Sequence, residues 1–333
     1  MIRLSARIAS LAALAALSLP VLQAAAQQQV PPAPAQDSTA TVPSAPAPAA
    51  APVFPKPDPA NFTAVSPTKE TVNAFLQTLW GYDDTRVWEV WSIQKTPVEG
   101  VTKVIVYVGD KTGKQKPSGT LFFALPDGKH IIAGDEIAPF GEHPFADFRT
   151  QLQQRADGPF RGSAVKDLEL VEFADFQCPH CKDAQANMDK LAVDFPKARI
   201  VFQNYPLPQH PAAANAAAYG VCVTKQGGSN AFFTFSAAVF DGQDGLATAD
   251  GATLTLNSAV AKAGLDPAKI AACAATPEAI AQVQASVKLA KDLSINQTPV
   301  LMINGRQVPI GGTPYEVIKQ IVQYQEKLDG IAQ

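Results

Sequence analysis

The sequence predicts an α/β chain in which a small α+β domain precedes a larger domain with a helical insertion in its sheet. Three stretches carry this prediction. Leu168–Asp175 is a short apolar run that indicates a buried strand, and a C-x-x-C motif then leads into the amphipathic run Lys182–Phe195. Residues 212–293 are rich in alanine and helical in pattern. Pro299–Ile310 reads as a hairpin, after which a last helix begins.

The N-terminus has the pattern of an export signal. Arg3 and Arg7 precede an apolar stretch, Ile8–Leu22, and three alanines follow shortly after it. This order predicts a secretory signal peptide over residues 1–26 that is cleaved after Ala26, and therefore a periplasmic or other extracytoplasmic location. An uncleaved membrane anchor is the alternative, although Pro20 interrupts the apolar stretch.

The 333 residues are enough for two ordinary domains, and 47% of them are hydrophobic. Residues 27–64 are Pro/Ala-rich with few large apolar side chains, so we expect a disordered linker, either a tether or a simple spacer. Residues 65–150 form the first domain, opened by a helix with Ser66 as N-cap and Pro67 at its first position. Residues 151–333 form the second domain, with the helical insertion at about 210–293.

The chemistry is predicted at Cys178-Pro179-His180-Cys181. Pro179 has a fixed φ angle and no N–H, so it suits the first turn of a helix. Cys178 then lies at the helix N-terminus, where free N–H groups and the helix dipole stabilise a thiolate. A strand, a C-x-x-C motif and a helix in this order are typical of a thioredoxin-like redox site.

Other uses of these cysteines are disfavoured. A structural zinc site usually has four ligands, but Cys222 and Cys273 stand alone and His210 has no partner at ligand spacing. A purely structural disulfide within C-x-x-C closes a small, strained ring. We therefore expect no metal and no cofactor. The formal charge of −3 and the lack of a basic stripe also argue against a nucleic-acid partner.

The remaining two cysteines, Cys222 and Cys273, are predicted to form a structural disulfide. Both lie in the helical insertion among apolar residues and alanines, without nearby cations that would activate a thiolate. An even number of cysteines in an exported chain favours pairing. Two free buried thiols are the alternative.

The C-terminal half, Ser163–Gln333, resembles the DsbA-like branch of the thioredoxin superfamily. The resemblance rests on C-P-H-C after a strand, the helical insertion, and Thr298-Pro299 leading into V-L-M-I-N-G. It implies that the Thr298–Pro299 bond is cis and lies against the dithiol, although the residues alone favour the ordinary trans form. Gln297 departs from the glycine that many relatives have there.

The same resemblance assigns roles to individual side chains. It implies that Cys178 is the attacking thiolate, that His180 lowers its pKa, and that Cys181 is the buried resolving thiol. Glu172, six residues before Cys178, matches a buried acid that assists proton transfer in DsbA-like proteins.

A second, shorter resemblance concerns the first domain. Phe122–Asp135, F-F-A-L-P-D-G-K-H-I-I-A-G-D, resembles part of the dimerisation domain of the DsbC and DsbG isomerases. It implies a homodimer with two facing dithiols.

These observations predict an exported thiol–disulfide oxidoreductase that introduces disulfides into secreted or periplasmic proteins. The alternative is a dimeric disulfide isomerase or chaperone of the DsbC/DsbG type. The partners expected are exported cysteine-containing client proteins and a membrane redox partner that restores the disulfide.

Overall fold

The computed structural model describes residues 53–113 and 116–331. The predicted signal peptide and most of the predicted linker lie outside these residues. Within the described residues no helix is long and apolar enough to cross a membrane.

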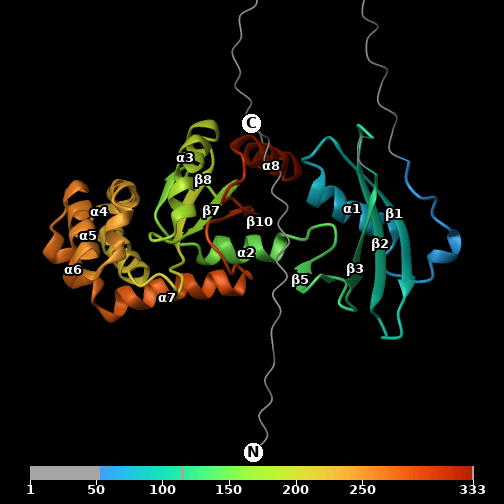
Figure 1. Cartoon of the computed structure of the whole chain (residues 1–333), viewed down its shortest axis with the longest axis horizontal. Coiled ribbons are helices and arrows are strands. Elements are labelled where there is room, and N and C mark those ends of the chain that lie inside the picture. Colours follow the sequence, from blue (N-terminus) through green and yellow to red (C-terminus); the bar gives the residue numbers. More distant parts are fainter. Residues whose placement is uncertain (1–52, 114–115, 332–333) are drawn as a thin grey trace, which may run out of the picture. The chain divides into compact units, whose positions relative to one another are not determined.

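The N-terminal part of the described chain is an antiparallel sheet with one helix, α1, on it (Figure 1). Five strands pair in sequence order, each antiparallel to the next. Val72, Phe75 and Leu76 of α1 are buried against apolar side chains of the sheet. The elements are α1 (Lys69–Trp80), β1 (Arg86–Lys95), β2 (Thr102–Asp110), β3 (Ser118–Ala124), β4 (His130–Ala133) and β5 (Glu136–Pro139).

The C-terminal part contains a mixed five-stranded sheet in the order β10-β9-β7-β8-β6. Strands β7 and β8 are parallel, and the other neighbouring pairs are antiparallel. Because β7 is central, all six of its residues are buried. The strands are β6 (Phe160–Gly162), β7 (Glu169–Ala174), β8 (Arg199–Asn204), β9 (Val300–Ile303) and β10 (Arg306–Pro309).

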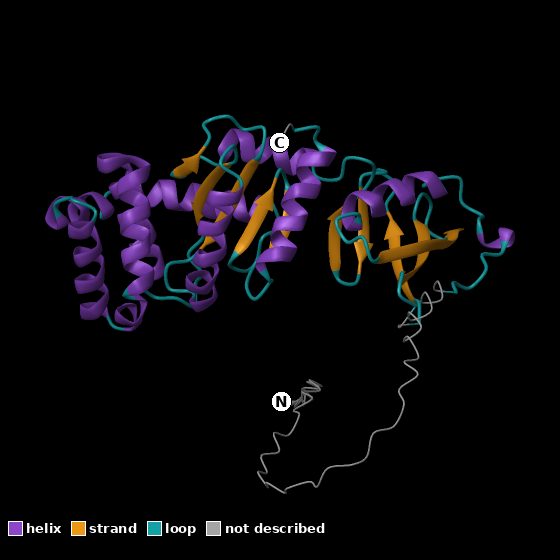
Figure 2. Ribbon diagram, turned by 90° about the horizontal axis from the view of Figure 1, so that it is seen from above, coloured by secondary structure: helices purple, strands orange, loops and turns teal. Residues whose placement is uncertain are grey.

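Alternate residues of this sheet face two separate cores. Leu170, Leu301 and Ile303 pack with α3 (Pro179–Asp194) and α8 (Tyr315–Leu328). Val171 and Met302 pack on the other face with α2 (Ala146–Arg155) and α7 (Pro277–Asp292). This alternation follows from the two-residue period of a strand. Figure 2 shows helices on both sides of the sheet. The sheet and its helices confirm the predicted α/β thioredoxin-like fold.

The helical insertion separates β8 from β9 (Figure 1), and its last helix, α7, also packs on the sheet. Gly228, at φ 72°, interrupts the long helix α4, where the sequence has two successive glycines. Buried Phe176 and Phe202 belong to the same core as the insertion's Phe232 and Phe235. The insertion comprises α4 (Ala213–Asp241), the 3-10 helix η2 (Gln243–Ala247), α5 (Ala249–Lys262), α6 (Pro267–Ala274) and α7.

Three features differ from the sequence-based expectations. The first helix begins at Lys69, because the Thr68 hydroxyl, not Ser66, accepts the Thr71 N–H and caps it. The short strands β5 and β6 were not predicted.

Residues 58–64, which we expected to belong to the disordered linker, are structured. They include the 3-10 helix η1 (Pro59–Asn61), and Phe62 bridges to Ile93 at the edge of β1. The N–H groups of Thr63 and Ala64 both donate to the Ile93 carbonyl. The linker prediction was wrong here because Phe62 packs against the core under α1, and the free edge of β1 accepts hydrogen bonds.

Candidate active site

The dithiol lies where β7 passes into α3. Cys178 is the N-cap residue of this 16-residue helix, and Pro179 occupies its first turn. The Cys178 carbonyl accepts the N–H groups of Cys181 and Lys182, at 3.1 and 3.3 Å. Both thiols are free and buried, with Cys178 5% and Cys181 0% exposed. The Cys178 sulfur therefore lies at the helix N-terminus, where the backbone N–H groups of His180 and Cys181 favour a thiolate.

The surroundings of Cys178 favour a thiolate. A hydrogen bond from Cys181 is the largest cause that lowers the pKa of Cys178, to about 5, against the opposing effect of burial. The Thr298 hydroxyl and the backbone N–H groups of Cys181 and His180 add to the lowering. A charged thiolate gains more from hydrogen-bond donors than a neutral thiol does, so each of these donors favours ionisation.

The resolving cysteine has the opposite environment. Burial, followed by the interaction with Cys178, raises the pKa of the Cys181 thiol far above its ordinary value. Within the described residues, the Asp175 N–H donates a backbone hydrogen bond to the Cys181 sulfur, at 3.4 Å. The two sulfurs of one motif are thus strongly unequal as acids.

Two residues distant in sequence complete the site. The Thr298–Pro299 peptide bond is cis and directly precedes β9. The Cys178 thiol lies 3.6 Å from the Thr298 carbonyl oxygen. The Thr298 hydroxyl is buried without a hydrogen-bond partner in the described part of the chain, so it is free to donate to a Cys178 thiolate.

Glu172 lies on β7 and is 3% exposed. Its Oε1 accepts a hydrogen bond of 2.8 Å from the Gln185 amide, which also donates to the Cys181 carbonyl. Burial raises the pKa of Glu172 to about 7, and the Gln185 hydrogen bond opposes this only in part. Glu172 is thus joined through Gln185 to the helix turn that carries Cys181, and it can exchange a proton near neutral pH.

His180 lies in the first turn of α3, beside the dithiol. Its side chain and that of Pro179 are exposed. His180 lowers the pKa of Cys178 through its backbone N–H. The His180 imidazole is therefore a surface feature beside the dithiol.

The sequence analysis did not identify several residues that hold the dithiol loop. Gln243 of η2 donates to the carbonyls of Phe176 and Cys178, at 2.8 and 3.0 Å. Gln177 accepts the Ala212 N–H and donates to the Leu246 carbonyl. The insertion thus anchors the loop through side-chain amides, which no local sequence pattern reveals.

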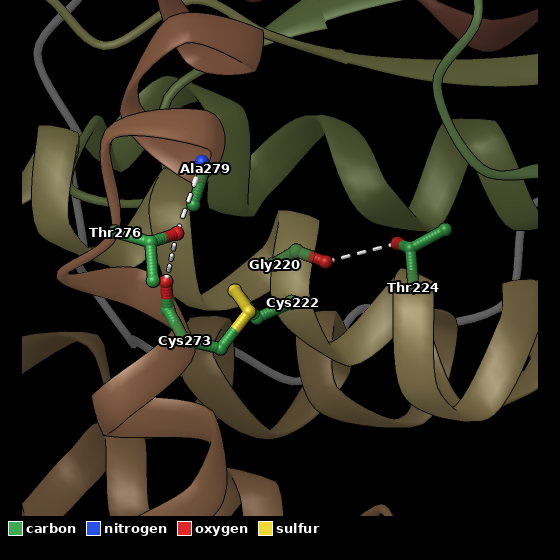
Figure 3. Close-up of a disulfide and its surroundings, with 6 residues drawn as sticks. All are labelled: Gly220, Cys222, Thr224, Cys273, Thr276 and Ala279. Carbon is green, nitrogen blue, oxygen red and sulfur yellow. Dashed lines mark hydrogen bonds between the residues drawn. A yellow bond between two sulfur atoms is a disulfide. The ribbon is translucent and has the colours of Figure 1, made fainter.

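The remaining two cysteines form a disulfide between α4 and α6, shown in Figure 3. The S–S bond joins Cys222 and Cys273, whose Cα atoms lie 6.0 Å apart. Next to it, Thr276 donates to the Cys273 carbonyl and accepts the Ala279 N–H, which caps α7 (Figure 3). Among the described residues there is no group of three or more metal-ligating side chains suited to a metal ion.

The low pKa predicts how Cys178 ionises in reduced protein. The thiolate should titrate with a midpoint near pH 5, as measured by its ultraviolet absorbance or by the rate of alkylation with iodoacetamide. Because the pKa in the folded protein is below the ordinary value of 9.0, the thiolate stabilises the reduced fold fully above pH 9. This stabilisation declines as the pH falls and is lost below about pH 5.

Cys178→Ser is the control for this titration, since it should remove the transition near pH 5. A midpoint above about pH 8, the range of an unperturbed thiol, would contradict the assignment of donors to the Cys178 sulfur.

The thioredoxin-like fold and this pair of unequal thiols form a dithiol site that is chemically able to carry out thiol–disulfide exchange. A family model described as thioredoxin matches residues 155–323, and the chain belongs to this family.

Among curated proteins, the chain is similar to a Na(+)/H(+) antiporter, NhaA 3, from Salinispora tropica. The two are 30% identical over 148 residues, which are 44% of this chain and 22% of the antiporter. The chain thus spans about a fifth of the length of this relative.

Among solved structures, ScsC from Proteus mirabilis in a transitional conformation is 22% identical, with a TM-score of 0.45. The match covers 54% of this chain and 81% of ScsC. A thioredoxin-like oxidoreductase from Silicibacter pomeroyi is 24% identical, with a TM-score of 0.46. That match covers 54% of this chain and 98% of the other.

Proposed function

We propose that the protein is an exported thiol–disulfide oxidase that transfers the Cys178–Cys181 disulfide to cysteine-containing client proteins. The observation that supports this direction is the low pKa of Cys178, about 5. The stabilised thiolate exists only when the pair is reduced, so it favours reduction of the protein and oxidation of the client.

The size of this preference follows from the pKa. One pKa unit corresponds to about 1.4 kcal/mol, so at pH 7 the thiolate stabilises the reduced pair by about 3 kcal/mol relative to an ordinary dithiol. For a two-electron couple this is a reduction potential higher by about 60 mV.

The proposed reaction has two exchanges. A client thiolate attacks the Cys178 sulfur, the bond to Cys181 breaks, and Cys181 leaves as a thiolate that takes up a proton. We assign the supply of this proton to the Glu172 carboxyl, whose pKa of about 7 permits it at neutral pH. A second client thiolate then attacks the client sulfur of the mixed disulfide, and Cys178 leaves as its stabilised thiolate. The client loses two electrons and the dithiol gains them.

The cycle needs an oxidant for the reduced dithiol. We propose a membrane redox partner that accepts two electrons from the Cys178–Cys181 pair and restores its disulfide. The export signal predicted for residues 1–26 supports an exchange outside the cytoplasm, where disulfides persist.

The direct test starts from the oxidised protein. Mixed at pH 7 with a reduced peptide that contains two cysteines, it should form the peptide disulfide and become reduced in equal amount. Protein first reduced with dithiothreitol is the control and should leave the peptide unchanged. A peptide that stays reduced at equilibrium would contradict the oxidase assignment.

A dimeric disulfide isomerase is the second candidate, and the N-terminal sheet supports it. Its outer strand β5 pairs only with β4 among the described strands, and Ile137 on it is 63% exposed. Unpaired N–H and C=O groups at such an edge can pair across a two-fold axis. An isomerase must be kept reduced, so trapping the thiols of Cys178 and Cys181 in intact cells separates the candidates. Mostly oxidised protein supports the oxidase, and mostly reduced protein supports the isomerase.

A further inference from the structure

Asp175 lies in the short loop that connects β7 to the dithiol at the start of α3. It follows the last residue of β7 and is 1% exposed. Its backbone contacts both cysteines: the Asp175 N–H donates to the Cys181 sulfur at 3.4 Å, and its carbonyl accepts the Cys178 N–H at 3.1 Å. A change in the Asp175 backbone therefore alters the hydrogen bond to the Cys181 sulfur and the backbone hydrogen bond to Cys178.

The Asp175 carboxylate is held by three donors. Oδ1 accepts the Gln177 N–H at 2.7 Å, and Oδ2 accepts the Leu207 N–H at 2.8 Å. The third donor is the His210 ring, whose Nδ1 lies 2.8 Å from Oδ2. The ring is 20% exposed, whereas the carboxylate is fully buried. His210 is the one side chain in this set, so it is the member that a substitution can remove.

His210 is itself fixed by the backbone. Its N–H donates to the Leu207 carbonyl at 3.0 Å, and its own carbonyl accepts the Ala213 N–H where α4 begins. The segment that carries it follows β8, which is parallel to β7. The loops after two adjacent parallel strands emerge at the same edge of the sheet, and this brings His210 to Asp175 although 35 residues separate them.

These contacts affect the stability of a thiolate on Cys181, which forms when the Cys178–Cys181 bond breaks. When the Cys178–Cys181 bond breaks, the negative charge appears on the buried Cys181 sulfur, which the Asp175 N–H can stabilise. The Asp175 carboxylate, also negative, opposes that charge unless a donor compensates it. Without the His210 donor, less of the negative charge on the Asp175 carboxylate is compensated, and the Asp175 N–H is less firmly oriented toward the Cys181 sulfur. Both changes disfavour a thiolate at Cys181.

We propose that His210 is a positioning residue for the exchange step at Cys181: it holds the Asp175 carboxylate so that the Asp175 N–H supports the Cys181 sulfur. The step is the one in which an incoming thiolate bonds to Cys178 and Cys181 leaves with the electron pair of the broken bond. This inference rests on the proposed thiol–disulfide exchange at the same site, but it does not depend on its direction.

The test compares His210→Leu with His210→Asn in the full mature chain. Oxidised protein is mixed with reduced glutathione, and the mixed disulfide at Cys178 is followed by acid quenching and mass spectrometry. His210→Leu should slow its formation about fivefold, the factor that corresponds to one net hydrogen bond of about 1 kcal/mol. His210→Asn, which keeps an amide donor, should react within about twofold of the wild type, because the donor and not the ring is required.

Two further readouts separate positioning from a general loss of structure. The alkylation rate of Cys178 in reduced protein should stay within about twofold of the wild type in both variants, since its main donors are unchanged. The matched control is His130→Leu, which removes a His–Asp pair of similar geometry on the N-terminal sheet, with Nδ1 of His130 2.6 Å from Asp127. It should leave the glutathione reaction unchanged.

The inference is overturned if His210→Leu reacts with glutathione as fast as the wild type, or if His210→Asn is as slow as His210→Leu. It is also overturned if Cys178 alkylation slows by the same factor as the glutathione reaction. Glutathione is not a client protein, so these outcomes are independent of whether the protein oxidises or isomerises clients. Failure of the oxidase proposal would instead appear with wild-type protein, as a dithiol peptide that stays reduced.

Discussion

Replacing Cys178 with serine is expected to abolish disulfide transfer to a reduced peptide. The Cys178 sulfur carries the thiolate with a pKa of about 5, and the incoming thiolate bonds to it in the proposed first exchange. A serine hydroxyl cannot form the mixed disulfide, so the rate should fall to that of the uncatalysed reaction. The measurement is peptide oxidation followed by mass spectrometry, with each variant pre-treated with an oxidant.

Cys181→Ser is the matched variant, because it removes the second thiol and leaves the donors from the helix backbone in place. When its Cys178 thiolate attacks a disulfide-bonded client and one client sulfur leaves as a thiolate, it should form a long-lived mixed disulfide between Cys178 and the client, visible on a non-reducing gel. Full transfer activity in Cys178→Ser would contradict the proposed chemistry. If that variant still suppressed aggregation of an unfolded client as well as the wild type does, a chaperone with an incidental dithiol would be the better description.

Removing the Cys222–Cys273 disulfide should strongly destabilise the C-terminal part of the chain. The bond closes a loop with a sequence separation of 51 residues. On the chain-entropy model such a cross-link stabilises the fold by about 4 kcal/mol, which is an upper figure. The double variant Cys222→Ala, Cys273→Ala should therefore unfold at a markedly lower urea concentration, as monitored by circular dichroism.

The control removes any contribution of the Cys178–Cys181 pair to the measured stability. Both the variant and the wild type are measured with the Cys178–Cys181 pair reduced and alkylated, so that only the second disulfide differs. Because Cys222 is fully buried, replacing it with alanine also leaves a small cavity. The single variant Cys222→Ala therefore measures the loss of the cross-link and the cavity at Cys222 together. An unchanged urea midpoint in the double variant would show that the insertion does not depend on this cross-link.

The sequence alone determined the parts of the site that depend on neighbouring residues. Pro179 in the first turn places Cys178 at a helix N-terminus, and the apolar run before it predicts the central strand β7. The hairpin of β9 and β10 was readable because Gly305, at φ 90°, adopts a backbone conformation that other residues avoid. Each of these inferences uses a rule that acts over a few residues.

Only the tertiary structure decided which distant side chains meet at the dithiol. Asp175 contacts His210 across 35 residues, and Gln243 reaches the Cys178 carbonyl across 65. The sequence could not predict these contacts, since a lone histidine or glutamine has no periodicity. The partner of His210 depends on the pairing of β7 with β8, and the partner of Gln243 depends on where the insertion packs. The short strand β5 was missed for the same reason: its four residues are held by hydrogen bonds to β4 and carry no signal of their own. The position of Cys178 at a helix N-terminus thus follows from adjacent residues, whereas the support of the Cys181 sulfur depends on which loops the sheet brings to one edge.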